Sequence, residues 1–408
     1  MKKIAGNPYL KKEIGRVLID FVPIDDFLGK FETPIMIFLE NKIRENLTVF
    51  KDVFNSIFNN KNLQTFYSLK ANYLPDICKI INSERIGAQI VGLPELKLAL
   101  KVGFPANKII VGGPYLPKEL IEKSIERQVK EIIVYNLSDL KHINSIAQKF
   151  DIIQNICLRV NSKKYNSKLG IILDRKSLKM LGNIINKNRN IRITTVLSHY
   201  SSQMNDFEQY EKNIKAIAEN INHLSKINVK CENINIGGGF PEATVMPKHR
   251  LENIAINIKS TIDNLGIDYK NIYFEPGRYI VGDTGLFLTK IIKVSEDRWI
   301  FLNIGNHVCP KFARCSLRFY NISQINEPHK YKTSIAGILP TDQDVLAKNY
   351  FFTENLIEED VVLVSNIGAY TLTFSNRFPY SLPKIFLVKG NNFRQIFDPS
   401  IDHDISIN

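Results

Sequence analysis

Several side chains able to do chemistry follow short β-branched segments of this sequence. A lysine that ends such a segment and is partly desolvated can lose its proton and form a Schiff base with an aldehyde. A glycine run lets backbone N–H groups approach a phosphate, and an arginine offers phosphate a fixed fork of donors. The residues are Lys70 after FYSL, Arg159 in ICLRV, His199 after TTVLS, Gly237, Gly238 and Gly239 after NINI, and Glu275 and Arg278 in EPGR.

Each of these residues also has a purely structural interpretation. Lys70 would then be a solvated surface lysine, and the three glycines a simple turn. Arg278 would pair with Glu275, and His199 would be a core histidine. The functional interpretation is favoured because all of them would lie at one end of the predicted strands.

The elements that position these residues alternate along the first two thirds of the chain. Eight β-branched segments begin near residues 65, 88, 108, 131, 156, 194, 233 and 272, and stretches of helical period such as 93–103 and 210–224 separate them. This alternation predicts an α/β fold, a closed parallel (β/α)8 TIM barrel over residues 35–283, with a doubly wound open sheet as the alternative. In a barrel the residues above would lie at the C-terminal ends of the strands, where TIM-barrel active sites form.

The alternation of predicted strands and helices ends after residue 283. Six further segments read as strands with few helical intervals: GLFLTKIIKV, RWIFLNIG, LRFYNIS, KTSIAGI, VVLVSNI and KIFLVKG. We therefore expect a second, β-barrel or β-sandwich domain made of residues 1–34 and 284–408.

Composition narrows the function classes. The formal net charge of +13 would allow nucleic-acid binding, but the lysines are spread along the chain, so we expect no nucleic-acid partner. No run of about 20 apolar residues predicts a membrane span, and the N-terminal segment does not resemble a secretory signal. The five cysteines are scattered without a CxxC pair, which predicts a cytoplasmic protein with neither a disulfide framework nor a metal site.

Five motifs together resemble one enzyme family. FYSLKAN, SHYSSQ, INIGGGFP, EPGRYIVGDTG and NIGAY, in this order, are similar to motifs of the fold-type III pyridoxal 5′-phosphate (PLP) decarboxylases. These are the ornithine, arginine and diaminopimelate decarboxylases, whose barrel is like that of alanine racemase. The resemblance covers roughly residues 35–390.

The resemblance implies a role for each residue. Lys70 would hold PLP as a Schiff base, and His199 would stack on the pyridine ring. Glu275 would bind the ring nitrogen and keep it protonated, so that the cofactor can accept electrons when a bond to Cα breaks. The phosphate would be bound by Ser202, Gly237, Gly238, Gly239, Arg278 and Tyr370 of GAY, with Arg159 bracing the site. A homodimer with shared active sites is also implied.

One segment departs from the family pattern. Decarboxylases of the family carry GPxC[DE]xxD, whose cysteine helps protonate the carbanion and whose acidic residue holds the distal amine of the substrate across the dimer interface. The matching stretch here is GILPTDQD, which places Pro340 and Thr341 at these positions, or Asp342 at the acidic one in a shifted register. Proline cannot donate a proton. Gln89 and Tyr115 also replace residues common in the family, an aspartate and a lysine.

Three interpretations follow from this departure. The chain could decarboxylate with another proton donor, such as Lys70, His199, water, Cys309 or Cys315. It could be a PLP-dependent racemase or epimerase, or a PLP-binding protein without activity. Because all the implied cofactor residues are present, decarboxylation is the first expectation.

The same departure bears on the substrate. A free distal ammonium in a desolvated pocket needs a carboxylate partner, and Thr341 offers none. Arg314, in ARCSLRF, is similar to the arginine with which diaminopimelate decarboxylases hold a distal carboxylate, although it could also be a surface residue. A masked amine and a carboxylate-rich end resemble the citryl-ornithine or citryl-diaminopropionate substrates of siderophore-pathway family members (rhizoferrin or staphyloferrin type). A diaminopimelate-, ornithine- or lysine-type decarboxylase is the alternative.

Overall fold

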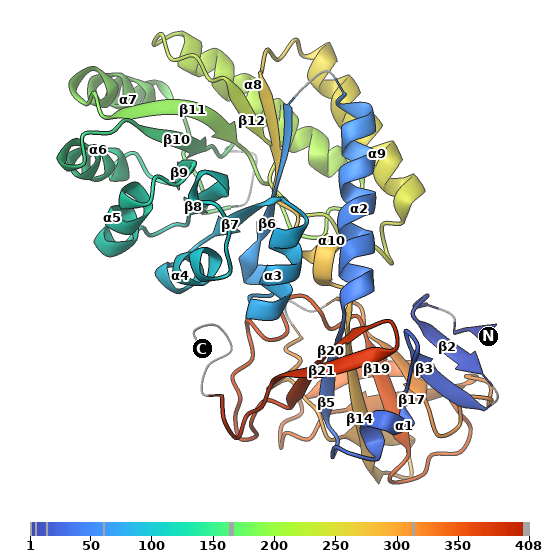
Figure 1. Cartoon of the computed structure of the whole chain (residues 1–408). Coiled ribbons are helices and arrows are strands. Elements are labelled where there is room, and N and C mark those ends of the chain that lie inside the picture. The colour runs from blue at the N-terminus through green and yellow to red at the C-terminus, as the bar shows by residue number, and fades with distance from the viewer. Residues whose placement is uncertain are drawn as a thin grey trace.

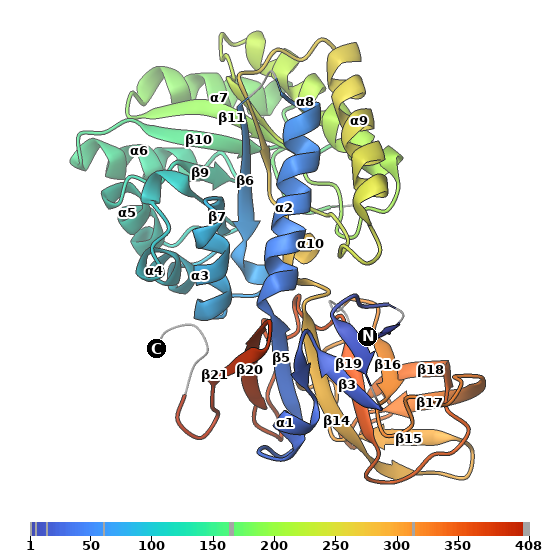
Figure 2. The ribbon, with the colours of Figure 1, turned by 45° about the vertical axis from the view of Figure 1, so that its right-hand side comes forward.

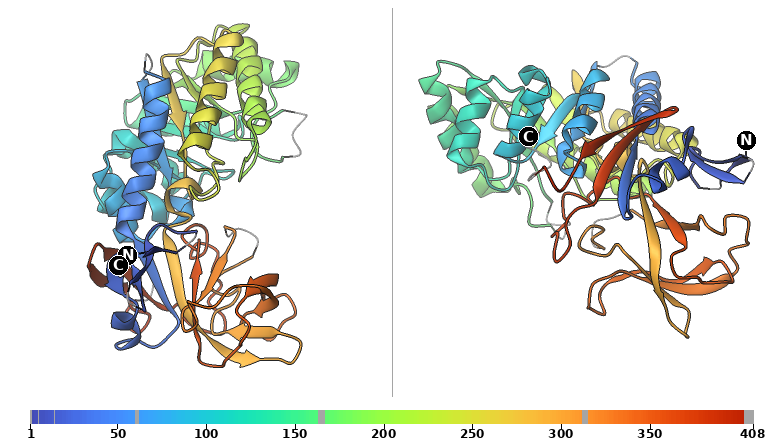
Figure 3. Two further views of the ribbon diagram at one scale, coloured as in Figure 1. Left: turned by 90° about the vertical axis from the view of Figure 1, so that its right-hand side faces the viewer. Right: turned by 60° about the horizontal axis from the view of Figure 1, so that its bottom comes forward.

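The computed structural model describes residues 2–4, 6–13, 15–59, 62–162, 167–311 and 315–402. A closed barrel and a β-sheet unit lie end to end (Figures 1 and 3). In the described part of the chain no helix has both the length and the apolar character that crossing a membrane requires.

Eight parallel strands close the barrel in the order β10-β11-β12-β13-β6-β7-β8-β9. Closure depends on the pairing of β13 with β6, in which Asn271 lies opposite Asn62. This excludes the open-sheet alternative and confirms the predicted barrel. The strands are β6 (Asn62–Ser68), β7 (Gly87–Ile90), β8 (Ile109–Gly112), β9 (Glu131–Val134), β10 (Gln154–Arg159), β11 (Ile191–Leu197), β12 (Asn233–Asn235) and β13 (Asn271–Phe274).

Helices surround these strands and bury their apolar faces against them (Figure 1). α8 begins with a capping box in which Asp206 and Gln209 satisfy each other's backbone N–H groups. The helices are α2 (Glu40–Ile57), α3 (Pro75–Ser83), α4 (Leu93–Lys101), α5 (Lys118–Glu126), α6 (Asp139–Lys149), α7 (Arg175–Lys187), α8 (Phe207–Ser225), α9 (Lys248–Asn264) and α10 (Arg278–Val281), with short 3-10 turns η1 (Leu69–Ala71) and η2 (Ala106–Lys108).

A layer of large side chains fills the barrel interior, as it does in other TIM barrels. It consists of Phe66, Ile110, Ile133, Cys157, Leu197 and Tyr273, one from each of six strands. The β6 strand points toward the β-sheet unit (Figure 2), so the C-terminal rim of the barrel faces that unit.

The β-sheet unit has a nine-stranded sheet and a four-stranded N-terminal sheet. The large sheet contains β5 (Ile35–Leu39), β14 (Gly285–Val294), β15 (Trp299–Leu302), β16 (Arg318–Asn321), β17 (Tyr331–Ala336), β18 (Val345–Phe352), β19 (Val361–Ser365), β20 (Lys384–Lys389) and β21 (Asn392–Phe397). The small sheet contains β1 (Lys2–Lys3), β2 (Leu10–Glu13), β3 (Arg16–Ile19) and β4 (Val22–Pro23), followed by α1 (Asp25–Leu28).

β5 lies outside the barrel. The sequence analysis assigned Ile35–Leu39 to the barrel unit, but this strand pairs with β14 and β20 of the large sheet. Its five residues are all buried, and such a continuous apolar run fits either unit equally well. The division of the chain into two domains stays a prediction, with its first boundary better drawn after Leu39.

Candidate active site

One cavity at the C-terminal rim of the barrel brings most of the predicted site residues together. Predicted residues that line it are Lys70, Arg159, His199, Ser202, Gly238, Gly239, Glu275, Arg278 and Tyr370. The described lining residues include three cations, Lys70, Arg159 and Arg278, and one carboxylate, Glu275. The cavity therefore carries a positive charge that suits an anionic ligand.

Lys70 lies in η1, directly after β6. Solvent reaches its side chain through the cavity, but protein surrounds the amine closely enough for desolvation to lower the pKa of Lys70. Glu275 opposes this shift, and Arg159 adds to it. The backbone carbonyl of Lys70 accepts a hydrogen bond of 2.7 Å from Thr373 Oγ1 in the β-sheet unit. Lys70 is thus held from both units of the chain.

Arg159 ends β10, and His199 lies beside it in the loop after β11. Arg159 Nη2 donates to the carbonyl oxygen of His199 at 3.4 Å, and Arg159 Nη1 donates to Tyr135 Oη at 2.7 Å. Burial, aided by Arg159 and Lys70, lowers the pKa of His199 to about 3, so its imidazole is neutral at neutral pH. Neither His199 Nδ1 nor Arg159 Nε, both buried, has a hydrogen-bond partner among the described residues.

Glu275 follows β13 and is oriented by the neighbouring strand. Asn235 Nδ2, at the end of β12, donates to Glu275 Oε1 at 2.7 Å. Burial raises the pKa of the Glu275 carboxyl, whereas Asn235, Lys70 and Arg159 lower it. The carboxylate is therefore best stabilised when a further donor or positive charge lies against it.

The glycine triplet allows several segments to meet at the rim. A Cβ on Gly238 would lie 2.4 Å from the carbonyl oxygen of Glu275, and one on Gly237 would lie 2.9 Å from His199 Nδ1. Gly237 and Gly239 have φ angles of 74° and 88°, a region that favours glycine. Gly238 and Gly239 line the cavity, whereas Gly237 lies behind His199.

Arg278 and Tyr370 close the cavity from α10 and the loop after β19. The guanidinium carbon of Arg278 lies 4.9 Å from the centroid of the Tyr370 ring, and Arg278 Nη1 donates to Cys315 Sγ at 3.1 Å. The Tyr370 N–H donates to the carbonyl oxygen of Ala71 at 2.7 Å, next to Lys70. Cys309 and Cys315, which the sequence suggested as proton donors, are buried and do not line the cavity.

The loop after β17 does not reach this cavity. Pro340, Thr341 and Asp342 are exposed and are not among its lining residues. Buried Asp344 fixes the loop by accepting hydrogen bonds of 2.7 Å from the N–H groups of Asn306 and Leu339. Arg314 lies outside the described residues.

Sequence reasoning missed two residues that organise the site. Tyr135 immediately follows β9, and Asn235 lies two residues before the glycine triplet. Both could have been found from their positions at the ends of predicted strands, where the barrel rim forms. Gln89, noted for its departure from the family, lines the cavity and accepts a hydrogen bond of 2.7 Å from Ser68 Oγ. Their roles depend on contacts between strands, which a single sequence does not display.

The donor set matches the groups of PLP. An amine is available for an aldehyde, a carboxylate for a ring nitrogen, and two arginines with glycine N–H groups for a phosphate. Arg159 Nε, which has no hydrogen-bond partner among the described residues, leaves a donor for such a ligand, and the lack of side chains at Gly238 and Gly239 leaves space for it.

Comparisons with known proteins lead to the same chemistry. Residues 40–282, more than half of the chain, match the family model described as "Pyridoxal-dependent decarboxylase, pyridoxal binding domain". The diaminopimelate decarboxylase of Methanocaldococcus jannaschii is 24% identical over 402 residues, covering 91% of this chain and 90% of the relative. The crystal structure of a diaminopimelate decarboxylase from M. jannaschii has a TM-score of 0.85 at 23% identity, covering 97% of this chain and 96% of that one.

A further relative has a different printed substrate. The L-glutamyl-[BtrI acyl-carrier protein] decarboxylase of Niallia circulans is 24% identical over 392 residues, covering 88% of each chain. Together with the barrel, its β-sheet companion and the composition of the rim cavity, these matches establish the enzyme class. The chain belongs to the pyridoxal-dependent decarboxylase family and is a PLP-dependent amino-acid carboxy-lyase.

Proposed function

We propose that this enzyme removes a carboxylate from an amino acid whose distal amine is masked as an amide. A citryl-ornithine- or citryl-diaminopropionate-like intermediate of siderophore synthesis fits this description. The observation that carries the proposal is the loop of residues 337–344, in which Pro340 and Thr341 stand where the family pattern has a thiol and a carboxylate.

In this proposal the rim residues hold and orient the cofactor. Lys70 binds PLP covalently, His199 lies against the ring, and Glu275 accepts a hydrogen bond from the ring nitrogen. Gly238, Gly239, Ser202, Arg278 and Tyr370 bind the phosphate, Gly237 supports His199 from behind, and Arg159 braces the site. The bound cofactor supplies an electron sink for the bond broken at Cα.

Proton delivery is assigned to Lys70. His199 is neutral at neutral pH because its pKa is lowered to about 3, so it is a poor proton donor there. Cys309 and Cys315 do not line the cavity. Lys70 does line it, and desolvation lowers the pKa of its amine, which makes the ammonium form a stronger acid.

The proposed substrate follows from charge. A distal ammonium ion in a water-excluded pocket needs a compensating carboxylate, and in the register aligned on Asp344 neither Pro340 nor Thr341 supplies one; only the shifted register would offer Asp342. An amide at that position carries no charge and can hydrogen-bond to a hydroxyl such as that of Thr341. The substrate named for the N. circulans relative is a glutamyl group joined to a carrier protein, which supports the idea that this family accepts conjugated as well as free amino acids.

We also propose a homodimer. Pro340, Thr341 and Asp342 are exposed and lie away from the cavity of their own chain, which leaves them available to the cavity of a second copy. An isologous contact would make the exchange reciprocal. Arg314 is proposed to hold a distal carboxylate of the substrate.

Carbon dioxide release tests the substrate proposal. The enzyme loaded with PLP should release carbon dioxide from citryl-ornithine or citryl-diaminopropionate, and much more slowly from ornithine, lysine and meso-diaminopimelate. A Thr341→Asp variant should gain activity toward the free diamines, because it restores a carboxylate. Equal or faster release from a free diamino acid by the unaltered enzyme would overturn the proposal.

The main alternative substrate is meso-diaminopimelate, which the names of several relatives favour. A racemase or epimerase is the other alternative, and it would exchange the Cα proton in heavy water without releasing carbon dioxide. The same reaction mixtures, analysed for both products, separate all three functions.

A further inference from the structure

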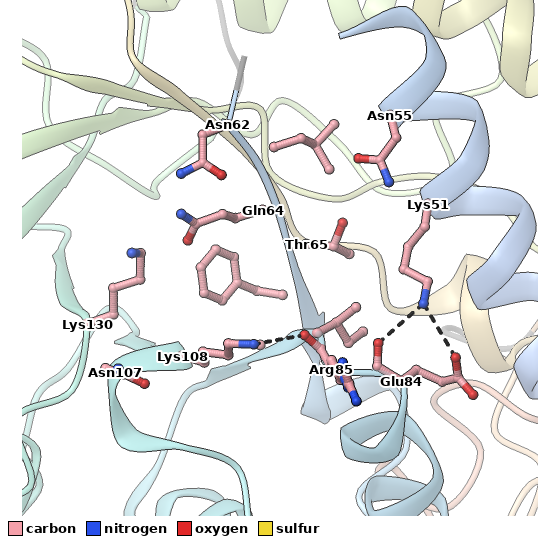
Figure 4. A pocket seen from close by; sticks show the side chains of 14 residues that line it. Lys51, Asn55, Asn62, Gln64, Thr65, Glu84, Arg85, Asn107, Lys108 and Lys130 are labelled. Carbon is pink, nitrogen blue, oxygen red and sulfur yellow. Dashed lines mark hydrogen bonds and ion pairs between the residues drawn. The ribbon is translucent and has the colours of Figure 1, made fainter. Parts of the chain in front are cut away.

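A second cavity lies at the opposite end of the barrel from Lys70. Its volume is about 580 Å³, and it is bounded by the start of β6, the turns that precede β7, β8 and β9, and the second half of α2 (Figure 4). The residues with polar side chains that line it are Lys51, Asn55, Asn62, Gln64, Thr65, Glu84, Arg85, Asn107, Lys108 and Lys130.

The cationic side chains of this cavity outnumber its acidic ones. Lys51, Arg85, Lys108 and Lys130 face one carboxylate, Glu84, among the described lining residues. Glu84 is already occupied, because Arg44 Nη1 contacts its Oε1 at 2.6 Å and Lys51 Nζ lies 3.4 Å from its Oε2. Glu84 therefore does not neutralise the other cations.

Three of the cations make no ion pair with a described residue. They are Arg85, Lys108 and Lys130; Lys108 Nζ instead donates to the carbonyl oxygen of Arg85 at 3.2 Å. Lys130 Nζ lies 5.5 Å from the centroid of the Tyr273 ring. Burial raises the pKa of the Glu131 carboxyl, and Lys130 is among the groups that oppose this shift. The Glu131 carboxylate, however, accepts hydrogen bonds from Thr194 and Thr195 inside the barrel.

Neutral donors line the same cavity. Asn62 and Gln64 project from β6 to the side of Lys108 and Lys130, and Thr65 projects to the side of Lys51 (Figure 4). Thr65 is 6% exposed, and its hydroxyl has no hydrogen-bond partner among the described residues. A buried hydroxyl without a partner is costly unless a ligand satisfies it.

We propose that this cavity binds a small multivalent oxyanion, a compound with two or more phosphate or carboxylate groups. Cations from several separate segments surround one concave space, so that a single anion can contact several of them. Arg85 and Lys108 are exposed at the mouth of this space, whereas Lys51 and Lys130 are half-buried in it. The cavity contains none of the rim residues, so the anion and the cofactor occupy different sites.

Titration calorimetry of the PLP-loaded enzyme, freed of excess PLP, tests this site. Inorganic pyrophosphate and citrate are titrated separately at low salt, and at least one should bind once per chain with a Kd below about 1 mM. The tighter of the two identifies phosphate or carboxylate as the preferred group. Absence of binding by both anions would overturn the proposal.

Variants locate the binding. Lys108→Gln combined with Lys130→Gln should weaken the anion about tenfold. Lys176→Gln combined with Lys179→Gln on α7 removes the same charge elsewhere and should leave the affinity unchanged. Equal weakening by both pairs would show a non-specific charge effect and contradict the site.

A variant that removes no charge tests the site independently, in case the lysine variants misfold. Thr65→Val keeps the shape of the side chain, should not lower the melting temperature, and should weaken the anion a few-fold. If Thr65→Val and the Lys108/Lys130 double variant both bind the anion as tightly as the unaltered enzyme, the anion binds elsewhere, for instance at the rim, and the proposal is wrong. The PLP absorbance band should stay constant during the titration, which separates this result from any failure of the proposed substrate.

Discussion

Asn235 Nδ2 donates a hydrogen bond of 2.7 Å to the Glu275 carboxylate, while Asn235 Oδ1 accepts one of 2.8 Å from the N–H of Gly237. One amide at the end of β12 thus orients both the carboxylate proposed to bind the ring nitrogen and the first residue of the glycine triplet. The carboxylate proposed for the ring nitrogen and the backbone behind His199 therefore share a single support.

Replacement of that amide should weaken PLP binding. Asn235→Ala removes a hydrogen bond to a buried carboxylate, worth about 2 kcal/mol, so the Kd of PLP should rise about thirtyfold. Absorbance titration of the cofactor-free enzyme measures this change. Asn233→Ala, two residues earlier on the same strand, removes bonds to Glu131 and Thr195 instead. It should lower stability without comparable loss of PLP affinity, and similar losses in both variants would count against the role of Asn235.

Lys70→Ala should abolish covalent attachment of PLP. Borohydride reduction followed by peptide mass spectrometry should locate the cofactor on the Lys70 peptide of the unaltered enzyme and nowhere in the variant. Decarboxylation should fall by at least about a thousandfold, because both the covalent site and the proposed proton donor are lost. Lys79→Ala, an exposed lysine on α3, is the matched control and should keep the label and the activity. Label on another lysine of the unaltered enzyme would refute the assignment.

The barrel could be predicted because its strands are β-branched, its helices are amphipathic, and its chemical residues all follow strands. β18 escaped prediction because the exposed residues Lys348 and Asn349 interrupt its apolar pattern. Ile35–Leu39 was included in the barrel unit although it pairs with the large sheet, because a fully buried strand has no polar face to indicate its neighbours.

The candidate site shows the same limit. Lys70, Glu275 and Arg278 were recognisable by motif, whereas Tyr135 and Asn235 act through contacts with residues 24 and 40 positions away. A single sequence gives no information on such pairings. The exposed position of Pro340 and Thr341 was likewise unpredictable, since it depends on how Asp344 fixes the loop.

Two glycine-to-alanine changes should have opposite effects on stability. A methyl group on Gly238 would lie 2.4 Å from the Glu275 carbonyl oxygen, a backbone atom that cannot move freely. Gly238→Ala should therefore lower the free energy of unfolding by at least about 2 kcal/mol. Gly182, in α7, has no atom within 4 Å of the added Cβ. Gly182→Ala should raise stability by about 0.5–1 kcal/mol. Urea unfolding of both variants measures the contrast, and a harmless Gly238→Ala would show that the rim is not tightly packed.

His199 should make the folded enzyme sensitive to acid. Its folded pKa of about 3 lies below the ordinary value of 6.5, so between these values the unfolded chain binds more protons. The His199 contribution to stability is therefore fully present above pH 6.5 and is lost as the pH falls toward 3. His199→Gln should reduce the loss of unfolding free energy between pH 7.5 and 5.5 by about 1 kcal/mol. Urea unfolding at the two pH values, for enzyme and variant, checks this. Identical pH dependence would mean that His199 is not desolvated.

Tyr135→Phe should separate orientation of Arg159 from its packing. The variant keeps the ring, whose centroid lies 4.7 Å from the guanidinium carbon, but loses the 2.7 Å hydrogen bond to Arg159 Nη1. Because Arg159 also holds the His199 carbonyl, the imidazole should shift against the cofactor. We expect kcat to fall about tenfold with little change in KM, since the proposed defect lies at the reacting centre.

The control for this change is Tyr273→Phe, in the barrel interior below the rim. Its ring lies in the packed layer and does not line the cavity, so its activity should stay close to that of the unaltered enzyme. A Tyr135→Phe variant with full kcat would show that Arg159 is positioned by ring packing and by His199 alone. A raised KM with unchanged kcat would instead assign Tyr135 to substrate binding, because a contact made equally in the ground and transition states affects KM and not kcat.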